Sequence, residues 1–429
     1  MPTGAGFGNL PRVTIEPNDP THDLLASASE VLIQNYTRLP VVFVRGHLSM
    51  LWDAAGNEYV DLFAGFGGAI LGHSHPELVM AAKAQLEQLW HVGNSFHTVP
   101  QIEFAERLKR HAFDGRAFFC HSGLEANEAA VKLARLRGLA DGGKRWKTVS
   151  LVKSFHGRSL AMIAATGNPA VKEGFGPPVP GFTNVDPLDF DALTRAVDDE
   201  TCCVLMEPIQ GEGGVNLYPA GHARRIRDFC DQHNLTLIFD EVWTGCGRTG
   251  KWFGHQWFTP DSHELFANPT LSNAPVLPDI MTLGKAVGGG LPVGVMFARP
   301  ELAKLMVAGR HGCTLGGNPT CMAVSRTIFD IIERDELVAR ARKLGDHVKH
   351  RLADESKLSS RIKEIRGHGL FLGIELDQPP EKFMEKCLDQ RLVSNLTAKS
   401  VVRIAPAINI TIAELDVGLD RLINVLASV

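Results

Sequence analysis

Lys285 and Asp240 are the residues of this chain whose types and positions best suit chemistry on a carbonyl group. Lys285 follows the strand-like segment IMTL (280–283) and precedes three glycines, which allow close approach of the backbone. A lysine in a partly apolar pocket can lose its proton and attack a carbonyl as an amine. Asp240 ends the apolar segment 235–239, where a carboxylate needs a cationic or donor partner. A surface lysine and an ion-paired or N-capping aspartate are the ordinary alternatives.

A third feature is a helix that begins with serine and glycine. Residues 124–140 form an amphipathic pattern directly after Ser122 and Gly123. Free backbone N–H groups and the helix dipole favour phosphate at such a start, although an ordinary helix can begin in the same way. Further side chains of interest follow strand-like segments, where sheet proteins bind ligands: Phe155, His156, Arg158, Glu207, Gln210, Glu212 and Glu241.

These groups together indicate pyridoxal phosphate. That cofactor requires a lysine that bonds to its aldehyde, an acidic side chain beside its ring nitrogen and an anion site for its phosphate. Asp240 would keep the ring nitrogen protonated, and Lys285 would carry a proton between the substrate carbon and the cofactor carbon.

Two other motifs point to different cofactors and fit less well. GCGRTG (245–250) matches the dinucleotide pattern, but the residues after it include Gly254 and Pro260 and do not resemble the helix that this pattern requires. A nicotinamide-dependent oxidoreductase is therefore the remote alternative. Four histidines lie close in the sequence, but no cysteine or carboxylate completes a metal-ligand spacing, so we expect no metal site: they are His73, His75, His91 and His97.

The elements that must position these groups alternate between strands and helices. Residues 147–155, 201–208 and 235–242 are strand-like, and a helix that begins at Pro219 is predicted between the last two. Such a strand–helix–strand unit predicts an α/β fold with a mostly parallel sheet. From about residue 313, charged helices and short strands predict a smaller α+β domain.

Composition and charge exclude several classes of protein. Apolar residues make up 44% and charged residues 21%, as in folded globular proteins. A net charge of −4 without long runs of one sign argues against a nucleic-acid partner. The eight cysteines contain no CxxC, which favours unpaired thiols in a reducing compartment. Glycines and a proline interrupt the most apolar stretch, 286–298, and no secretory signal is visible, so we expect a cytoplasmic protein without a membrane partner.

Seven longer motifs follow one another along the chain: LWHVGNSFHTVPQ, FFCHSGLEANEAAVKLAR, SFHGRSL, MEPIQGEGGV, LIFDEVWTGCGRTG, PDIMTLGKAVGGGLPVG and HGCTLGGNP. With these motifs the chain resembles, nearly end to end, the class III aminotransferases, which are fold type I pyridoxal-phosphate enzymes. Within the class the acetylornithine aminotransferases are most similar. The resemblance implies an N-terminal segment (1–60) that packs with the small domain, a large cofactor-binding domain (61–312) and a small C-terminal domain (313–429).

The resemblance also implies how the cofactor is bound. Lys285 is its covalent attachment point, Asp240 pairs with its ring nitrogen, and Phe155 and Val242 lie against the two ring faces. The phosphate is bound partly by Thr314 of the other subunit, which implies a homodimer. The complete predicted cofactor-binding set is Ser122, Gly123, Leu124, Phe155, Asp240, Glu241, Val242, Trp243, Lys285 and Thr314.

For the substrate, the resemblance implies three charged residues and one thiol. Arg158 binds the carboxylate far from the reacting amine, Glu212 and Arg403 match a switch pair, and Cys313 stands at a substrate-associated position. We expect transfer of an ω-amino group, best N-acetyl-ornithine, to 2-oxoglutarate in arginine biosynthesis. Succinyldiaminopimelate, succinylornithine, ornithine and 4-aminobutyrate are the alternative donors.

Several residues depart from the family pattern. Trp243 replaces a glutamine that binds the 3-hydroxyl of the cofactor. Either its indole N–H donates to that hydroxyl, or water replaces the contact, or the ring packs into a dimer interface. Gly67-Gly68-Ala69 is smaller than the common Ala-Val-Asn. Leu124 replaces a smaller residue, His97 a tyrosine and Cys313 a serine. The Pro-, Asn- and Ser-rich loop 260–278 is longer than usual.

Overall fold

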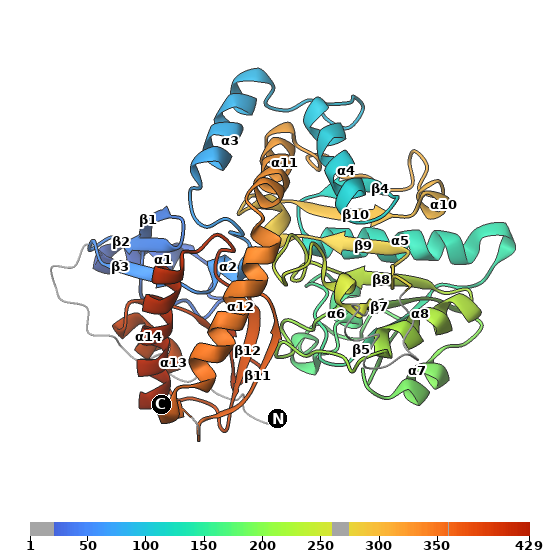
Figure 1. Cartoon of the computed structure of the whole chain (residues 1–429). Helices are drawn as coiled ribbons and strands as arrows, with labels where there is room; N and C mark the ends of the chain where they lie inside the picture. The colour runs from blue at the N-terminus through green and yellow to red at the C-terminus, as the bar shows by residue number, and fades with distance from the viewer. Residues whose placement is uncertain (1–20, 260–273, 359) are drawn as a thin grey trace.

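The computed structural model describes residues 21–259, 274–358 and 360–429 (Figure 1). Most of the predicted loop 260–278 lies outside these ranges. A seven-stranded sheet forms the larger part of the molecule, and only β10 runs antiparallel to its neighbours. The predicted mostly parallel sheet is therefore confirmed. In spatial order its strands are β4 (Arg116–Cys120), β10 (Gly294–Ala298), β9 (Ile280–Leu283), β8 (Thr236–Asp240), β7 (Thr201–Met206), β5 (Lys147–Leu151) and β6 (Phe182–Val185).

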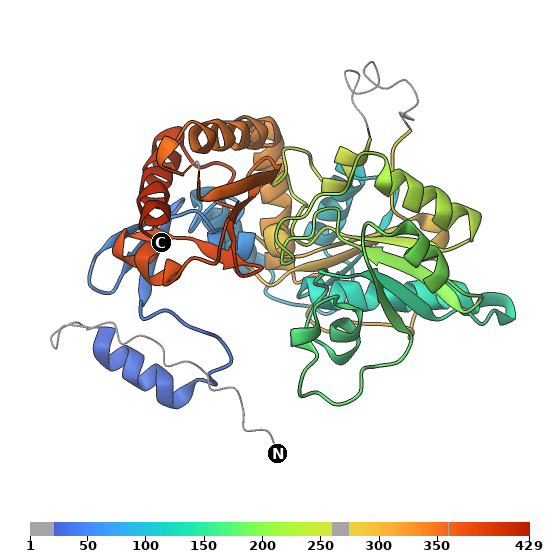
Figure 2. The same ribbon diagram turned by 90° about the horizontal axis from the view of Figure 1, so that it is seen from below.

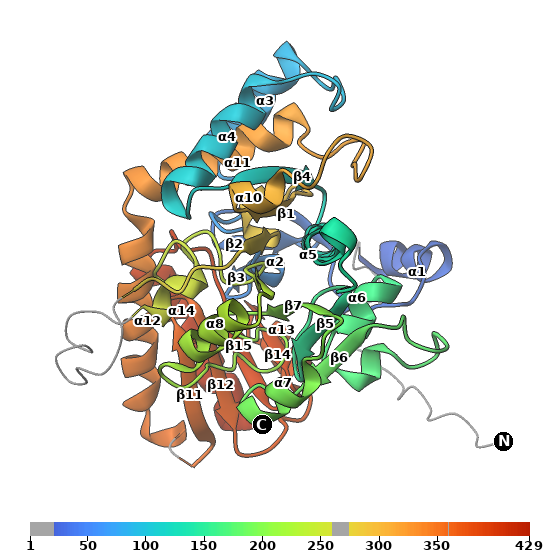
Figure 3. The ribbon, with the colours of Figure 1, turned by 90° about the vertical axis from the view of Figure 1, so that its right-hand side faces the viewer.

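Helices cover both faces of this sheet (Figure 3). Along β7, Cys203 and Leu205 pack in a core with α5 (Gly123–Leu139), whereas Val204 and Met206 pack in a core with α8 (His222–Gln232). Successive residues of a strand point to opposite faces, so burial on both sides requires the continuous apolar run that the sequence contains. On the α5 face also lie α6 (Leu160–Ala165) and α10 (Pro300–Ala303), and on the α8 face lies α7 (Phe190–Ala196).

Two element boundaries differ from the sequence prediction. The helix predicted to begin at Pro219 begins at His222, because Gly221 adopts a left-handed conformation (φ 78°) just before it. The strand predicted over 147–155 ends at Leu151. The chain then turns toward the site at the carboxyl ends of the strands.

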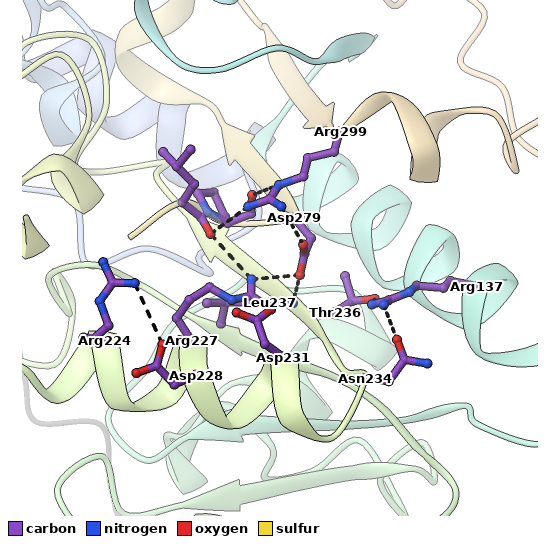
Figure 4. Close-up of polar contacts among 12 residues, drawn as sticks. Arg137, Arg224, Arg227, Asp228, Asp231, Asn234, Thr236, Leu237, Asp279 and Arg299 are labelled. Carbon is purple, nitrogen blue, oxygen red and sulfur yellow. Dashed lines mark hydrogen bonds and ion pairs between the residues drawn. The ribbon is translucent and has the colours of Figure 1, made fainter. Parts of the chain in front are cut away.

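At the amino-terminal ends of β8 and β9, away from the site, a charged cluster joins the two strands (Figure 4). Asp279, just before β9, accepts hydrogen bonds from the backbone N–H of Leu237 at 2.8 Å and from Arg227 of α8 at 2.9 Å. Arg299 lies 3.7 Å from the same carboxylate. These contacts join both strands to α8 and so set the relative position of their carboxyl ends.

The C-terminal residues form an α+β region beside the central sheet (Figure 1). Its antiparallel sheet has the order β11 (Ile362–His368), β12 (Phe371–Leu376), β15 (Val401–Ile404) and β14 (Asn395–Thr397). A second sheet joins the N-terminal strands β1 (Phe43–His47), β2 (Met50–Asp53) and β3 (Glu58–Asp61) to β13 (Leu392–Val393). The helices of this region are α11 (Pro319–Arg334), α12 (Leu337–Ala353), α13 (Phe383–Asp389) and α14 (Ile412–Ser428).

The remaining elements are three longer helices near the N-terminus and several short helices along the chain. α1 (Thr21–Val31) lies apart from the rest of the chain in Figure 2, and α3 (Pro76–Gln88) and α4 (Val99–His111) pack on α11. Among the described residues, no helix has the length and apolar character needed to cross a bilayer. The short helices are α2 (Ala64–Gly67), η1 (Ala140–Gly142), η2 (Pro169–Val171), η3 (Gly254–Phe258), η4 (Lys285–Gly288) and η5 (Ser356–Leu358).

Candidate active site

Asp240 is the last residue of β8 and is almost completely buried, with 3% of its surface exposed. One carboxylate oxygen accepts a hydrogen bond from Asn127 of α5 at 2.7 Å and lies 2.8 Å from Nδ1 of His156. The other oxygen accepts from the backbone N–H of Val242 at 3.0 Å. Asn127 in turn accepts from the Thr282 hydroxyl on β9. The buried carboxylate thus has the donor partners that its burial requires.

Lys285 begins η4, two residues after β9 ends, and its backbone is left-handed (φ 46°). Burial, together with the charge of Arg403, lowers the pKa of Lys285 to about 7, although Glu212, Asp240 and Glu207 oppose this shift. The amine forms no hydrogen bond or ion pair with the residues that the structure describes, and it lies 3.7 Å from the ring centroid of Trp243. A neutral amine is therefore available at neutral pH.

Glu212 and Arg403 form an ion pair that joins the segment after β7 to the C-terminal sheet. Arg403 on β15 donates to Glu212 at 3.0 Å and to the carbonyl of Gly211 at 3.1 Å. Its second nitrogen donates to Asn395 on the neighbouring strand β14 at 2.7 Å. Burial alone would raise the pKa of Glu212, but the charges of Arg403 and Lys285 and two hydrogen bonds lower it below its ordinary value. Glu212 is therefore ionised at neutral pH.

Trp243 lies between these charged groups. Its indole N–H donates to Glu212 at 3.1 Å, so it has an acceptor other than the predicted cofactor hydroxyl. Only 5% of the residue is exposed, and its ring stacks on Phe371 of β12 with centroids 5.2 Å apart. The ring is therefore buried within one chain, which argues against the alternative of a packed dimer interface.

The start of α5 faces the same strand ends. Ser122 is the N-cap, and its hydroxyl accepts from the backbone N–H of Glu125 at 3.3 Å. A Cβ on Gly123 would lie 2.4 Å from the Val242 side chain, and a Cβ on Gly284 would lie 2.8 Å from the backbone nitrogen of Gly123. Both glycines are needed for this close approach of β9, α5 and the segment after β8.

Arg158 and Phe155 lie on the segment that follows β5. The Arg158 guanidinium is 5.5 Å from the Phe155 ring centroid, is exposed, and forms no ion pair with any described residue. The backbone N–H of Phe155 donates to Glu207 at 2.9 Å, which fixes this segment against the end of β7. Burial, and then the charge of Asp240, raises the pKa of Glu207 well above its ordinary value.

Comparisons with known proteins show which family the chain is similar to. The sequence model described as Aminotransferase class-III matches residues 32–426. The acetylornithine aminotransferase of Myxococcus xanthus is 39% identical over 95% of this chain and 98% of its own.

The chain belongs to the class III aminotransferases.

Solved structures show the same fold. The ornithine aminotransferase from Toxoplasma gondii, whose active site is partially occupied by pyridoxal phosphate, superposes with a TM-score of 0.86 at 29% identity, with 96% of both chains covered. The N-acetylornithine aminotransferase from Stenotrophomonas maltophilia K279a has a TM-score of 0.76 at 32% identity, with 94% of this chain and 98% of that chain covered. Pyridoxal phosphate is the cofactor of this class of enzyme, and the free amine of Lys285 beside the buried Asp240 fits it.

Two predicted site residues have partners in the structure that the sequence did not predict. Glu241 turns away from the site, because its fully buried carboxylate accepts from the backbone N–H groups of Gly254 and His255 at 2.7 and 2.8 Å. The Cys313 sulfur lies 3.3 Å from Nδ1 of His121. Thr314 is exposed in this single chain, which leaves it free for the predicted contact with another subunit.

His121 and Cys313 form a group with Glu125 that the sequence did not predict. One ligand-type atom of each lies within 4.8 Å of the others. One oxygen of Glu125 accepts from the backbone N–H of His121 at 2.9 Å and from the Ser122 hydroxyl at 3.0 Å, so this carboxylate takes part in the cap of α5.

Sequence reasoning missed the partners of Asp240 and Trp243. Asn127 lies one helical turn inside α5, where its pattern is that of an ordinary helix residue, and His156 was noted only as one of several residues after a strand. A buried amide on an apolar helix face was the available signal for Asn127. Phe371 carried no signal at all, because only the fold brings β12 to this site.

Proposed function

We propose that this aminotransferase transfers the terminal amino group of N-acetyl-ornithine to 2-oxoglutarate, a reaction of arginine biosynthesis. Relatives named acetylornithine aminotransferase, from bacteria as different as Myxococcus xanthus and Caldanaerobacter subterraneus, are 38–39% identical over 95% of this chain. The observation that carries the proposal is the free amine of Lys285, with a pKa of about 7, at the same strand ends as the buried Asp240.

Pyridoxal phosphate, when bound, supplies an electron sink for the electrons left on the substrate carbon. With a pKa of about 7, the Lys285 amine can accept and return a proton at neutral pH, and it would move the proton that leaves the substrate carbon. Asp240, held by Asn127 and His156, would pair with the ring nitrogen of the cofactor. The N–H groups at Gly123 and Leu124, at the start of α5, would hold its phosphate.

Three charged residues near Lys285 allow the same site to bind both N-acetyl-ornithine and glutamate or 2-oxoglutarate. Arg158, exposed and without an ion pair among the described residues, binds the carboxylate distant from the reacting amine. Arg403 binds the second carboxylate of glutamate or 2-oxoglutarate after Glu212 moves away. With N-acetyl-ornithine, the Glu212–Arg403 pair stays closed, because an unpaired buried cation would be costly.

The working enzyme is a homodimer in the cytoplasm. Exposed Thr314 reaches the phosphate of the other subunit, and large apolar side chains lie exposed near it, among them Phe96. All eight cysteines are free thiols, as in a reducing compartment.

A panel of amino donors with 2-oxoglutarate as acceptor tests the function. We expect N-acetyl-ornithine to give the highest kcat/KM among N-acetyl-ornithine, succinylornithine, succinyldiaminopimelate, ornithine and 4-aminobutyrate.

Lys285→Ala should abolish turnover, and borohydride should fix the cofactor to the peptide that contains Lys285. Asp240→Asn should slow proton removal by about 100- to 1000-fold, the range for loss of one electrostatic contribution to a transition state. A preference for another donor would overturn the substrate, and fixation elsewhere would overturn the site.

A further inference from the structure

We infer that Trp243 determines substrate specificity by holding Glu212 closed on Arg403. This inference rests on the proposed function, because it concerns which carboxylate the site admits. Trp243 is a positioning residue: it acts on the substrate through Glu212 and Arg403. The enzyme would thereby favour amino donors that have no carboxylate on the reacting carbon.

The contacts of Glu212 support this inference. One oxygen of Glu212 receives the indole N–H at 3.1 Å and the guanidinium of Arg403 at 3.0 Å. When Glu212 moves away from Arg403, its carboxylate therefore loses two hydrogen bonds, one from Arg403 and one from Trp243. Without the indole N–H it would lose only the bond from Arg403. A hydrogen bond to a charged group contributes about tenfold or more to such an equilibrium. Admission of an α-carboxylate to Arg403 is correspondingly less favourable than it would be without the indole.

The ring itself is fixed in place from several sides. Phe371 stacks on it with an interplanar angle of 12°, and Phe63 lies with its centroid 6.5 Å away. The Arg403 guanidinium carbon lies 4.3 Å from the ring centroid, and the Lys285 amine lies 3.7 Å from it. Cations near an indole face are stabilised by the ring. The indole cannot swing aside easily, so its N–H remains directed at Glu212.

Two glycines make room for this large side chain. A Cβ on Gly67 would lie 2.6 Å from Cζ3 of Trp243, and a Cβ on Gly211 would lie 2.8 Å from its Cδ1. Gly67 belongs to the Gly67-Gly68-Ala69 segment, which is smaller than its counterpart in the family pattern. The small residue at 67 and the large residue at 243 therefore fit one another, as expected if the indole has a function in the site.

A binding experiment on the holoenzyme tests this without turnover. Trp243→Phe keeps an aromatic ring that can stack on Phe371 but removes the N–H donor. Glutarate has two carboxylates, whereas pentanoate has one and needs only Arg158. By calorimetry we expect the ratio of glutarate affinity to pentanoate affinity to rise about tenfold in Trp243→Phe. Arg403→Ala in the same background should abolish this gain.

Half-reactions measured by stopped flow provide the second readout. In Trp243→Phe, KM for glutamate should fall relative to KM for N-acetyl-ornithine, while the two kcat values change by similar factors. An unchanged affinity ratio, or a gain that persists without Arg403, would overturn the role of Trp243. If the wild-type protein used glutamate but not N-acetyl-ornithine, the proposed function would fail, yet the glutarate measurement would still decide the role of Trp243.

Discussion

At the scale of single residues, the protonation of Lys285 is the property on which the chemistry depends. Its side chain is enclosed by Trp243, Arg403 and the buried end of β8, and burial lowers its pKa from the ordinary 10.5 to about 7. The protonated lysine is thus disfavoured in the folded state. An ordinary exposed lysine would be almost entirely protonated, and unreactive toward an aldehyde, at the same pH.

This environment predicts the pH dependence of cofactor uptake. In the apoenzyme, the rate constant for covalent attachment of pyridoxal phosphate should rise with pH through a midpoint near 7, because only the neutral amine reacts. Absorbance at the wavelength of the bound cofactor measures this rate. A midpoint near 10 would contradict the assigned environment. Lys251→Ala, which changes another lysine near the aromatic ring of Trp257, is the matched control and should leave the midpoint unchanged.

The lowered pKa of Lys285 also makes the stability of the folded apoenzyme depend on pH. Between about pH 7 and 10.5 the unfolded chain carries a proton on Lys285 that the folded apoenzyme does not, so stability from this group rises with pH over that range. Below pH 7 the penalty for the buried charge is fully present.

Residue types and positions predicted Lys285 and Asp240 as members of one site, and the family resemblance added Glu212 and Arg403. The structure brings the four residues together. The same reasoning could not predict the acceptor of the Trp243 N–H. Glu212 lies 31 positions away in the chain, and its distance from the indole depends on how the segment after β7 folds back.

At the scale of elements, the site depends on close approaches between segments that follow strands. The strand ends were predictable, since continuous apolar runs marked β7 and β8. The start of α8 was not predictable, because the left-handed turn at Gly221 shifts it past Pro219.

The dinucleotide motif 245–250 is followed by turns and the short 3-10 helix η3 instead of an α-helix, as the sequence predicts. Its Arg248 is buried and donates to the carbonyls of Leu370 and Pro406.

The fit between Gly67 and Trp243 can be measured by a double-mutant cycle. Gly67→Ala should destabilise the wild-type background by about 1–3 kcal/mol through overpacking, in addition to the strain at φ 73°. In Trp243→Gln the backbone strain remains but the clash with the ring is gone. We therefore expect a coupling energy above about 0.5 kcal/mol from chemical denaturation of the four variants.

Gly56→Ala is the matched control for this cycle, because Gly56 also has a positive φ (85°) but no heavy atom within 4 Å of the added Cβ. Its effect should be the same with Trp or Gln at position 243. Additive effects for Gly67 and Trp243 would show that Gly67 is required only for its backbone conformation.

At the scale of the whole molecule, exposed apolar side chains support the proposed homodimer. Trp90 is 70% exposed and Phe96 is 65% exposed on the segment between α3 and α4. Asn94 of that segment donates to the carbonyls of Cys313 and Gly316, so this apolar surface adjoins Thr314. The sequence implied a homodimer only through the family resemblance, since a list of apolar residues does not tell which of them the fold leaves uncovered. The domain boundaries at residues 61 and 313 remain predictions.

This arrangement links assembly to cofactor retention. Phe96→Glu places a charge on the exposed apolar surface beside Thr314, where partner contact would bury it without a counterion. We expect light scattering to show a monomer for Phe96→Glu, and dialysis to remove pyridoxal phosphate faster than from the wild type, because the partner's Thr314 no longer holds the phosphate. Leu188→Glu is the matched control, since Leu188 is 59% exposed between β6 and α7, away from Thr314, and this variant should remain a dimer.

Thr314→Ala separates the loss of the dimer from the loss of the cofactor: this variant should remain a dimer and still lose pyridoxal phosphate faster than the wild type. A dimeric Phe96→Glu would place the interface elsewhere, and a monomer that retains the cofactor as well as the wild type would show that each chain holds its phosphate alone.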